Sequence, residues 1–525
     1  MNFSTLDFII FFGYCVFIIV FGLWISRERK GHIKNSTDYF LASKSLPWWA
    51  IGASLIAANI SAEQFIGMSG SGFAIGLGIA SYEFMAAVTL LLVAKYFLPI
   101  YLKEGIFTMP QFLKLRYDDR IRTSLAVFWI MLYIFVNLTS VLYLSALALS
   151  VVLDISTTQA IIGLAFIAVA YSSYGGLTAV AWTDVVQVIF LVFGGLVTTY
   201  LALDAVGGGQ GALVGLGDLY EKVPQKFDMI LSEDNPFYKD LPGMTVLFGG
   251  MWIANVSYWG FNQYIIQRAL AAKSLKEVQW GLVFAAFLKL LIPLVVVLPG
   301  IAAFALNADI DRYDQAYPWL LNNLVPTGVK GLAFAALIAA ALSSLSSMMN
   351  STATIFTMDI YKAHLKPEAT EKQLVTIGRL VSLVSIIIAV FVAEPLLGGE
   401  EQIFQFIQKY TGFVSPGIVV LFVFGLFWKK ATSNAALATA IASVPVSILI
   451  DVLFPAMPFL DQMGVVFLLL STLIIVYSLI ENKTRGTVPE NYIRIEKQLF
   501  KTDFIFNVAA MVILLATAAI YIIFW

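Results

Sequence analysis

The chain has 525 residues, of which 60% are hydrophobic and 12% are charged, and its mean hydropathy is +0.86. Average proteins carry about 25% charged residues, so this composition indicates an integral membrane protein. The formal net charge of −1 at pH 7 excludes a polybasic nucleic-acid-binding protein.

Few residues could support metal or phosphate chemistry. The one cysteine, Cys15, lies in an apolar run, and the two histidines, His32 and His364, lie in polar connections. The sequence has no G-x-x-x-x-G-K-[ST] phosphate loop. We therefore expect neither a metal-centred enzyme nor an ATP-driven pump, and no feature of the sequence supports an enzyme.

Apolar stretches about 20 residues long, the length of a membrane-crossing helix, recur along the whole chain. Fourteen are predicted, at 7–26, 47–72, 77–98, 124–153, 157–175, 184–204, 244–267, 277–305, 331–358, 375–397, 403–427, 434–453, 459–480 and 503–524. Lys and Arg concentrate in alternate connections, including 27–44, 103–122, 268–276 and 483–501. Because basic loops stay in the cytoplasm, this alternation and the even number of spans predict that both termini lie outside.

The second span, 47–72, is polar at its centre. The polar residues there are Ser54, Asn59, Ser61, Glu63 and Gln64. Because unpaired polar groups are costly in hydrocarbon, this stretch must face protein or a water-filled cavity. Its small residues also fit a helix that only packs closely against its neighbours.

The seventh span, 244–267, has a similar interruption, with Gly and Asn where a helix should be strongest. By the orientation above, it runs opposite to the second span. Interrupted helices at matching positions of two antiparallel halves are typical of inverted-repeat transporters with a binding site at the membrane midplane.

Two ionisable residues are predicted near mid-membrane, Glu83 in the third span and Lys289 in the eighth. Each costs about 2.5–3.5 kcal/mol there on insertion scales. One explanation is a structural ion pair or snorkelling to the interface. The other is a cavity in which an acid, a base and the amides of Gln64 and Asn255 bind a neutral polyhydroxyl ligand.

The ninth span, 331–358, contains a run of alanines and serines. Ser343, Ser347 and Asn350 share one helical face, and hydroxyl and carbonyl oxygens suit an alkali cation. The alternative is that the serines only allow close helix packing. Asp184, at the cytoplasmic start of the span 184–204, would bring one negative charge to such a site.

Three longer runs, Ala57–Gly67, Tyr258–Tyr264 and Asn350–Tyr361, resemble the sodium/solute symporter family, most closely its bacterial sodium/galactose and sodium/glucose branch. The resemblance extends over essentially the whole chain and implies an all-α membrane fold with a LeuT-type core of two inverted five-helix repeats. The implied parts are an N-terminal helix and loop (1–46), repeat 1 (47–204), an extracellular loop (205–243), repeat 2 (244–427) and C-terminal helices (428–525).

The resemblance also implies site residues. Sodium would be held by Ala57, Ile60, Ala340, Ser343 and Ser344. Sugar would be bound by Asn59, Gln64, Glu83, Asn255, Lys289 and Gln408, with the ring of Tyr258 on its cytoplasmic side. The outer gate would be Met68, Tyr82 and Phe404.

Two positions depart from the galactose-transporting pattern. Ala86 stands in place of a serine, which leaves the sugar preference open. Ser346 stands in place of an alanine and, with Asp184, Ser343 and Ser347, would complete a second sodium site. Because two bare sodium ions repel strongly in a low-dielectric interior, the charge of Asp184 favours two ions per sugar. The alternative is that Asp184 only caps the N-terminus of its helix.

We therefore predict a sodium-driven symporter that imports a neutral hexose across the bacterial cytoplasmic membrane by alternating access. The expected partners are the sugar, one or two sodium ions and the lipid bilayer, with no nucleic acid, and a homodimer stays open. One alternative is a symporter of a carboxylate such as sialic acid or proline, which would need a cation beyond Lys289. Another is a passive channel or a sensor, which would show no sodium dependence.

Overall fold

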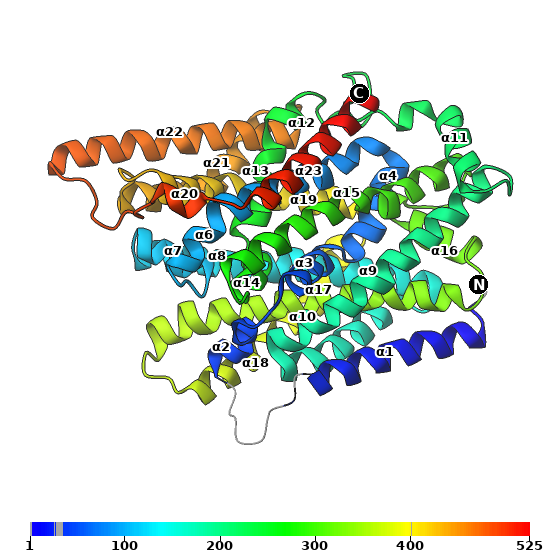
Figure 1. The fold of residues 1–525 in the computed structure, drawn as a ribbon, viewed down its shortest axis with the longest axis horizontal. Coiled ribbons are helices and arrows are strands. Elements are labelled where there is room, and N and C mark those ends of the chain that lie inside the picture. Colours follow the sequence, from blue (N-terminus) through cyan, green and yellow to red (C-terminus); the bar gives the residue numbers. More distant parts are fainter. Residues whose placement is uncertain (1–2, 26, 28–34, 401) are drawn as a thin grey trace.

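A computed structural model of the chain describes residues 3–25, 27, 35–400 and 402–525. Within these residues the secondary structure is helical, apart from one isolated parallel bridge between Leu46 and Ala272. Figure 1 shows the long helices side by side along the horizontal axis of the view. Residues 28–34 of the first basic connection lie outside the described residues.

The helices of the two halves have the following bounds. The first half contains α1 (Thr5–Ile25), α2 (Ser36–Leu41), η1 (Ala42–Lys44), α3 (Trp48–Asn59), η2 (Glu63–Met68), α4 (Ser69–Ala74), η3 (Leu77–Ala80), α5 (Ser81–Leu92), η4 (Val93–Phe97), α6 (Leu98–Lys103), α7 (Met109–Arg116), α8 (Asp119–Leu132), η5 (Tyr133–Leu138), α9 (Thr139–Leu153), α10 (Thr157–Val206), α11 (Ala212–Lys222) and η6 (Pro224–Lys226). The second half contains α12 (Thr245–Phe248), α13 (Gly250–Val256), η7 (Ser257–Phe261), α14 (Gln263–Leu270), α15 (Leu275–Ala305), η8 (Tyr313–Gln315), α16 (Ala316–Asn323), α17 (Val329–Ile355), η9 (Phe356–Leu365), α18 (Glu371–Leu397), α19 (Ile403–Gly412), α20 (Ser415–Phe427), α21 (Ser433–Leu453), α22 (Phe459–Arg485), η10 (Lys497–Phe500) and α23 (Phe504–Ile523).

Among the described residues, ten helices are long and apolar enough to cross a membrane, or eleven if α19 and α20, bent by 47°, form one span. The chain is thus a multi-pass membrane protein. Of the fourteen predicted spans, 47–72 and 244–267 are broken into short pieces, and 157–175 contains only the shorter apolar stretch Thr157–Ala170. The exact number of fourteen therefore stays a prediction.

The serine-rich helix α17 lies at the centre of the bundle. It is buried over nearly its whole length, whereas α1, α21, α22 and α23 are largely exposed on the outside. Its small residues allow α1, α3, α10 and α18 to pack against it. Because many hydroxyls would be unfavourable against lipid tails, this central position is what permits such a composition.

Both halves of the first interrupted helix, α3 and α4, pack on α15 through glycines. A Cβ added at Gly52 of α3 would lie 2.6 Å from the Gly281 carbonyl oxygen, and one at Gly300 would lie 2.0 Å from the Ser69 carbonyl oxygen of α4. Such approaches are possible only without a side chain. They hold the interruption against α15, the helix that carries Lys289.

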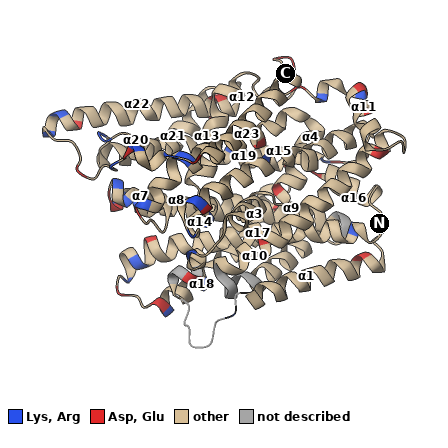
Figure 2. Ribbon diagram, viewed as in Figure 1, with Lys and Arg blue, Asp and Glu red and all other residues tan. Residues whose placement is uncertain are grey.

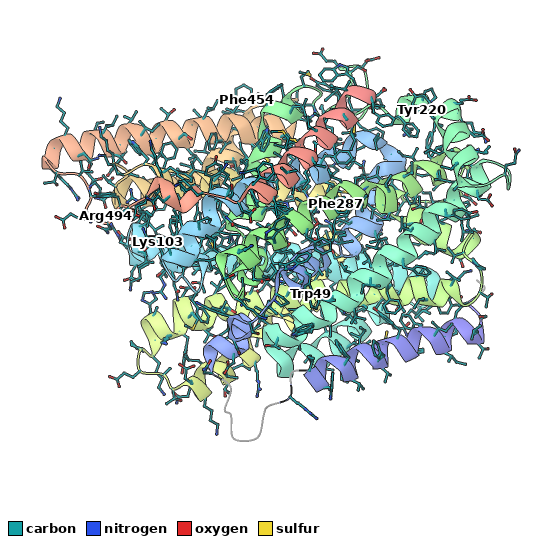
Figure 3. The ribbon with its side chains drawn as sticks, viewed as in Figure 1. Trp49, Lys103, Tyr220, Phe287, Phe454 and Arg494 are labelled. Carbon is teal, nitrogen blue, oxygen red and sulfur yellow. The ribbon has the colours of Figure 1, made fainter. Side chains whose placement is uncertain are left out.

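Many of the Lys and Arg side chains gather at the end of the bundle where α7 and the C-terminal end of α22 lie (Figure 2). The start of α1 and the end of α23 lie toward the opposite end (Figure 1). At the basic end, the Lys103 ammonium donates to the Arg494 carbonyl oxygen at 3.3 Å, which fixes the connection after α22 to α6 (Figure 3). Large apolar side chains such as Phe287 and Phe454 are exposed on the outside, as expected for a surface in lipid.

The N-terminal helix α1 is fixed to α17 by one carboxylate. Asp7 is fully buried, and its Oδ1 accepts hydrogen bonds from the backbone amides of Gly328 (2.7 Å) and Gly331 (2.9 Å). The first amides of a helix lack acceptors within the helix and carry partial positive charge. Asp7 is therefore a cap for α17 that is supplied by another helix.

We expect Gly300→Ala to destabilise the folded protein by about 1–3 kcal/mol, the usual cost of overpacking, because the new Cβ would meet backbone atoms of α4. Thermal unfolding of the purified protein in detergent would show this as a lower unfolding temperature. Gly163→Ala is the control, because nothing lies within 4 Å of a Cβ at Gly163. Equal unfolding temperatures for Gly300→Ala and the wild type would contradict the close contact.

Candidate functional site

The first interruption deprives two backbone carbonyls of their usual helical donors. α3 ends at Asn59, and the Ser61 amide donates to the Asn59 carbonyl (3.0 Å) where a continuous helix would use Ala57. The Gln64 amide likewise donates to the Ser61 carbonyl (3.1 Å) where a continuous helix would use Ile60. The carbonyls of Ala57 and Ile60 are the two that were predicted to bind sodium.

The second interruption is filled by a tyrosine. After the π-helical turn η7, the backbone of Asn262 is extended, with φ −78° and ψ 126°. The Tyr133 hydroxyl donates to the side-chain oxygen of Asn262 and accepts from the Gln263 amide (3.0 Å). Irregular backbone inside a membrane is tolerated where protein supplies such partners.

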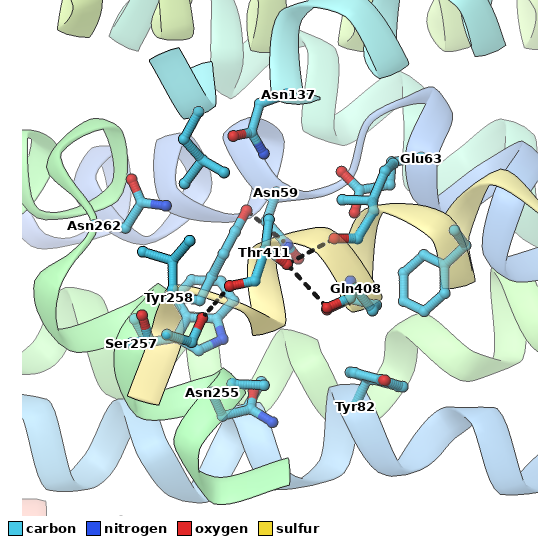
Figure 4. A pocket seen from close by; sticks show the side chains of 18 of the residues that line it. Asn59, Glu63, Tyr82, Asn137, Asn255, Ser257, Tyr258, Asn262, Gln408 and Thr411 are labelled. Carbon is cyan, nitrogen blue, oxygen red and sulfur yellow. Dashed lines mark hydrogen bonds between the residues drawn. The ribbon is translucent and has the colours of Figure 1, made fainter. Parts of the chain in front are cut away.

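A cavity of about 850 Å³, including its mouth, is lined by residues of both interrupted helices. All seven residues predicted to contact the sugar line it, namely Asn59, Gln64, Glu83, Asn255, Tyr258, Lys289 and Gln408. Figure 4 shows Asn59 and Glu63 of the first interrupted helix facing the same space as Asn255 and Tyr258 of the second. The fold thus brings the predicted set together, while the role of each residue as a ligand stays a prediction.

The two ionisable residues predicted at mid-membrane form a buried ion pair. The Lys289 ammonium lies 2.5 Å from Glu83 Oε2, donates to the side-chain oxygen of Asn59 and lies 4.9 Å from the centroid of the Trp259 ring. Both charges are shielded from solvent, with Lys289 0% exposed. A buried pair is tolerated only when further hydrogen bonds satisfy it, and here Asn59 provides one.

The same contacts continue to the second interruption. The Asn59 amide nitrogen donates to the Tyr258 hydroxyl at 3.1 Å, and the Tyr264 hydroxyl also donates to Tyr258. A chain of hydrogen bonds therefore runs from Lys289 through Asn59 to Tyr258. It connects the end of α3 with η7 across the cavity.

Two of the three predicted gate residues meet. The rings of Tyr82 and Phe404 pack edge to face with centroids 5.2 Å apart, and both residues line the cavity. Met68 is fully buried but does not line the cavity. Of the three, Tyr82 and Phe404 thus line the cavity together, and Met68 is buried outside its lining.

Helix α19, which carries Phe404 and Gln408, is capped by a buried acid. Asp314 lies in the connection between α15 and α16, and its Oδ2 accepts from the Ile403 amide at 3.1 Å. Burial raises the pKa of this carboxyl to about 8. Because this pKa lies above the ordinary value of about 4, the carboxyl favours the folded state below pH ~4, and this contribution is lost as the pH rises to about 8.

The prediction missed several polar residues of the cavity, among them Glu63, Asn137 and Thr411. Glu63 is an ionisable residue inside the span 47–72, and this was the signal that could have placed it with Glu83 and Lys289. Asn137 is buried, and its Oδ1 has no hydrogen-bond partner among the described residues. A lone amide in the apolar span 124–153 could have indicated it.

The hydroxyls predicted for the sodium site come from α17 and are buried. Ser344 Oγ donates to the Ala58 carbonyl at 3.0 Å, and Ser343 Oγ donates to Asp184 Oδ1. Each hydroxyl oxygen keeps lone pairs that could face a cation. α17 and the end of α3 are thus in direct contact beside the carbonyls of Ala57 and Ile60, and the donor types fit sodium.

Two of the residues predicted for a second sodium site, Asp184 and Ser347, contact an arginine that the prediction did not include. The Arg268 guanidinium of α14 lies 3.2 Å from Asp184 Oδ2 and also donates to Ser347. The Ser346 hydroxyl donates to the Leu342 carbonyl of its own helix at 2.8 Å. Asp184 lies inside α10, so the alternative that it caps the N-terminus of its helix is wrong.

Comparison with known proteins gives consistent likenesses. Residues 39–443 match the sequence profile of the Sodium:solute symporter family. The chain is 52% identical to the sodium/glucose cotransporter of Vibrio parahaemolyticus over 99% of this chain and 98% of that protein. It is 34% identical to the sodium/myo-inositol cotransporter 2 of Sus scrofa over 86% of this chain and 70% of that protein.

Solved structures show the same fold at lower identity. A Na⁺-coupled sialic acid symporter in a substrate-bound, outward-open state matches with a TM-score of 0.78 and 24% identity, over 93% of this chain and 100% of that one. A nucleobase-cation-symport-1 family transporter in a closed conformation matches with a TM-score of 0.54 and 16% identity, over 86% and 96%. The two interrupted helices, the match over residues 39–443 and the 52% identity lead to one conclusion: this chain belongs to the sodium:solute symporter family.

Proposed function

We propose that the chain imports a neutral hexose of the glucose or galactose type together with sodium. The observation that carries this proposal is the charge balance of the residues predicted to contact the sugar. Lys289 is already paired with Glu83, and the other predicted ligands are amides and one phenol. This set offers donors and acceptors to hydroxyls. The sodium/glucose cotransporter that is 52% identical supports a hexose.

A carboxylate substrate is the weaker candidate. Within the described lining of the cavity, Lys289 is the basic residue, and Glu63 adds a second acid beside Glu83. A ligand carboxylate would have to compete with Glu83 for the one ammonium and would lie beside a second acidic side chain, Glu63. Both effects favour a neutral ligand.

In the proposed cycle, sodium binds to the carbonyls of Ala57 and Ile60 and to oxygens of Ala340, Ser343 and Ser344. The ion would tie the end of α3 to α17 and favour the outward-open state. Sugar would then bind, and the gates would close around it. Each cation that moves inward adds a driving free energy of about 2.3 kcal/mol per 100 mV of membrane potential. Loss of sodium to the cytoplasm would then release the sugar.

The proposed placement is the bacterial cytoplasmic membrane, with fourteen spans, both termini outside and repeats at 47–204 and 244–427. The alternation of basic connections supports this orientation. The lipid bilayer is the expected surrounding, and a homodimer stays open.

Uptake of labelled hexoses into proteoliposomes, with and without an inward sodium gradient, tests the proposal. We expect concentrative uptake of glucose or galactose only with the gradient. Sialic acid and proline serve as competing solutes. The order in which different hexoses compete would show which sugar is preferred by the site that contains Ala86. Uptake that does not depend on the sodium gradient would indicate a passive channel. A lack of uptake for every hexose would reject the proposed substrate.

Transport should require the ion pair between Glu83 and Lys289. This requirement is separate from any effect of the pair on folding. We expect Glu83→Gln and Lys289→Met each to abolish saturable hexose uptake, because the first replaces the carboxylate by a neutral amide and the second removes the ammonium from the cavity. Each single variant should also be less stable than the double variant, because it leaves one buried charge unpaired. Uptake and unfolding temperature are measured for all four proteins, with Glu221→Gln as a control outside the cavity. Normal transport kinetics in either single variant would reject the cavity as the binding site.

The sodium site should depend on Ser344. We expect Ser344→Ala to raise the sodium concentration for half-maximal uptake about tenfold, because one hydroxyl ligand is lost at a cost of about 1–1.5 kcal/mol. Hexose affinity at saturating sodium should change much less. Thr352→Val is the matched control, since the Thr352 hydroxyl donates to the Met348 carbonyl within the same helix. An unchanged sodium dependence in Ser344→Ala would exclude this hydroxyl from the site.

A further inference from the structure

A second cavity, here called the lateral cavity, lies between α8, α20 and α21. Its volume is about 430 Å³ including its mouth, and its lining is apolar apart from two serines. Leu125 and Leu421 in this lining are buried, whereas Ile441 is 65% exposed, so the cavity opens to the outside beside α21. Ile441 lies eight residues after the start of α21 at Ser433, or about 12 Å along the helix. This depth places the opening among lipid tails and not in water.

The lateral cavity shares part of its wall with the cavity that contains the predicted sugar ligands. Val414 and Ile418 line both cavities. They lie just after the bend of 47° between α19 and α20, and α19 carries Phe404 and Gln408. An occupant of the lateral cavity would therefore contact two side chains whose position shapes the other cavity.

A polar rim lies below the lateral cavity, at the basic end of the bundle. Arg120 on the first turn of α8 donates from Nη2 to the side-chain oxygen of Asn434 on the first turn of α21, at 2.9 Å. The lining begins four residues further along α8, at Ser124, and six residues further along α21, at Ala440. These steps correspond to about 6–9 Å, so the rim and the cavity form one continuous path from the membrane surface into the hydrocarbon.

The rim carries more positive than negative charge. Lys429 and Lys430 lie in the turn that joins α20 to α21, and both are exposed. Asp118 pairs with Arg120 at 2.7 Å and offsets one of these three basic charges, while Glu481 is paired with Arg485 at 2.6 Å. Basic pockets between membrane helices, on the side where Lys and Arg gather, are typical sites for anionic lipid headgroups.

We propose that the lateral cavity binds one acyl chain of an anionic phospholipid, whose phosphate lies at Arg120, Lys429 and Lys430. The lipid comes from the leaflet that meets the basic end of the bundle. Its chain packs behind Val414 and Ile418 and holds these side chains as a wall of the other cavity. The arginine fork suits phosphate oxygens. Binding of this lipid does not depend on which solute the protein transports.

Native mass spectrometry of the purified protein tests the headgroup. The protein is incubated with an equimolar mixture of phosphatidylglycerol and phosphatidylcholine, and the lipids that stay bound are counted. We expect the wild type to retain one phosphatidylglycerol in preference to phosphatidylcholine. Arg120→Gln should reduce this preference about fivefold, the contribution of one basic residue near an anionic lipid. Lys372→Gln is the control, because Lys372 is exposed at the start of α18, which does not line the cavity.

Two substitutions test the cavity itself. Ala440→Phe places a ring inside it, and Ile441→Trp covers its mouth from a position that is already exposed, so that folding is not at risk. Both should lose the preferred phosphatidylglycerol. Ile448→Phe is the matched control, because Ile448 lies on the same helix, is 47% exposed and is outside the lining.

Transport tests the shared wall, and this part rests on the proposed hexose import. In phosphatidylcholine proteoliposomes, added phosphatidylglycerol should lower the hexose concentration for half-maximal uptake by the wild type. Ala440→Phe should show the low value with and without phosphatidylglycerol, because its ring supports Val414 and Ile418 in place of the acyl chain. Ile441→Trp, which only covers the mouth, should keep the high value in both.

The outcomes separate the site from the proposed function. Equal retention of the two lipids by the wild type would overturn the anionic site, and unchanged retention in both Ala440→Phe and Ile441→Trp would overturn the lateral cavity as its place. A dependence on phosphatidylglycerol that is the same in all variants would overturn the role of the shared wall. A wild type that retains the lipid but takes up no hexose would reject the proposed function alone.

Discussion

Backbone groups that leave a helix inside a membrane must find other partners, and this requirement shapes the whole molecule. The two interruptions meet it in different ways. At the second, Tyr133 supplies both a donor and an acceptor to Asn262 and Gln263. At the first, the amides of Ser61 and Gln64 are satisfied within the turn, whereas the carbonyls of Ala57 and Ile60 keep their capacity to accept. The second interruption is thus stabilised by hydrogen bonds from a side chain, whereas the carbonyls of the first are suited to binding an ion.

This difference explains how a cation site and a sugar site could act together without touching the same atoms. Asn59 lies on the last turn of α3, two residues after Ala57, and its side chain receives the Lys289 ammonium and donates to Tyr258. An ion that fixes the Ala57 carbonyl would therefore also fix the amide at the centre of the cavity network. The coupling would be local and would need only the ordering of one helical turn.

The sequence predicted the cavity well because the cost of burying polar groups in a membrane is large and specific. Glu83, Lys289, Gln64 and Asn255 stood out for that reason, and all four line one cavity. Arg268 did not stand out, since it lies in a basic segment that resembled an ordinary cytoplasmic connection; its burial depends on contacts with α3, α10 and α17. The number of spans could not be fixed either, because the interrupted helices are divided into pieces that are each too short to cross a membrane.

The cap that Asp7 provides has a practical meaning for studies of ion affinity. Gly331, which it contacts, lies nine residues before Ala340, or about 13 Å along α17. α17 cannot slide by one turn against α1 without exposing its first amides, so the two helices are expected to move as one body. An affinity tag or truncation that displaces the first turn of α1 would release the helix whose serines are proposed to bind sodium. Placing the tag at the other terminus avoids that disturbance.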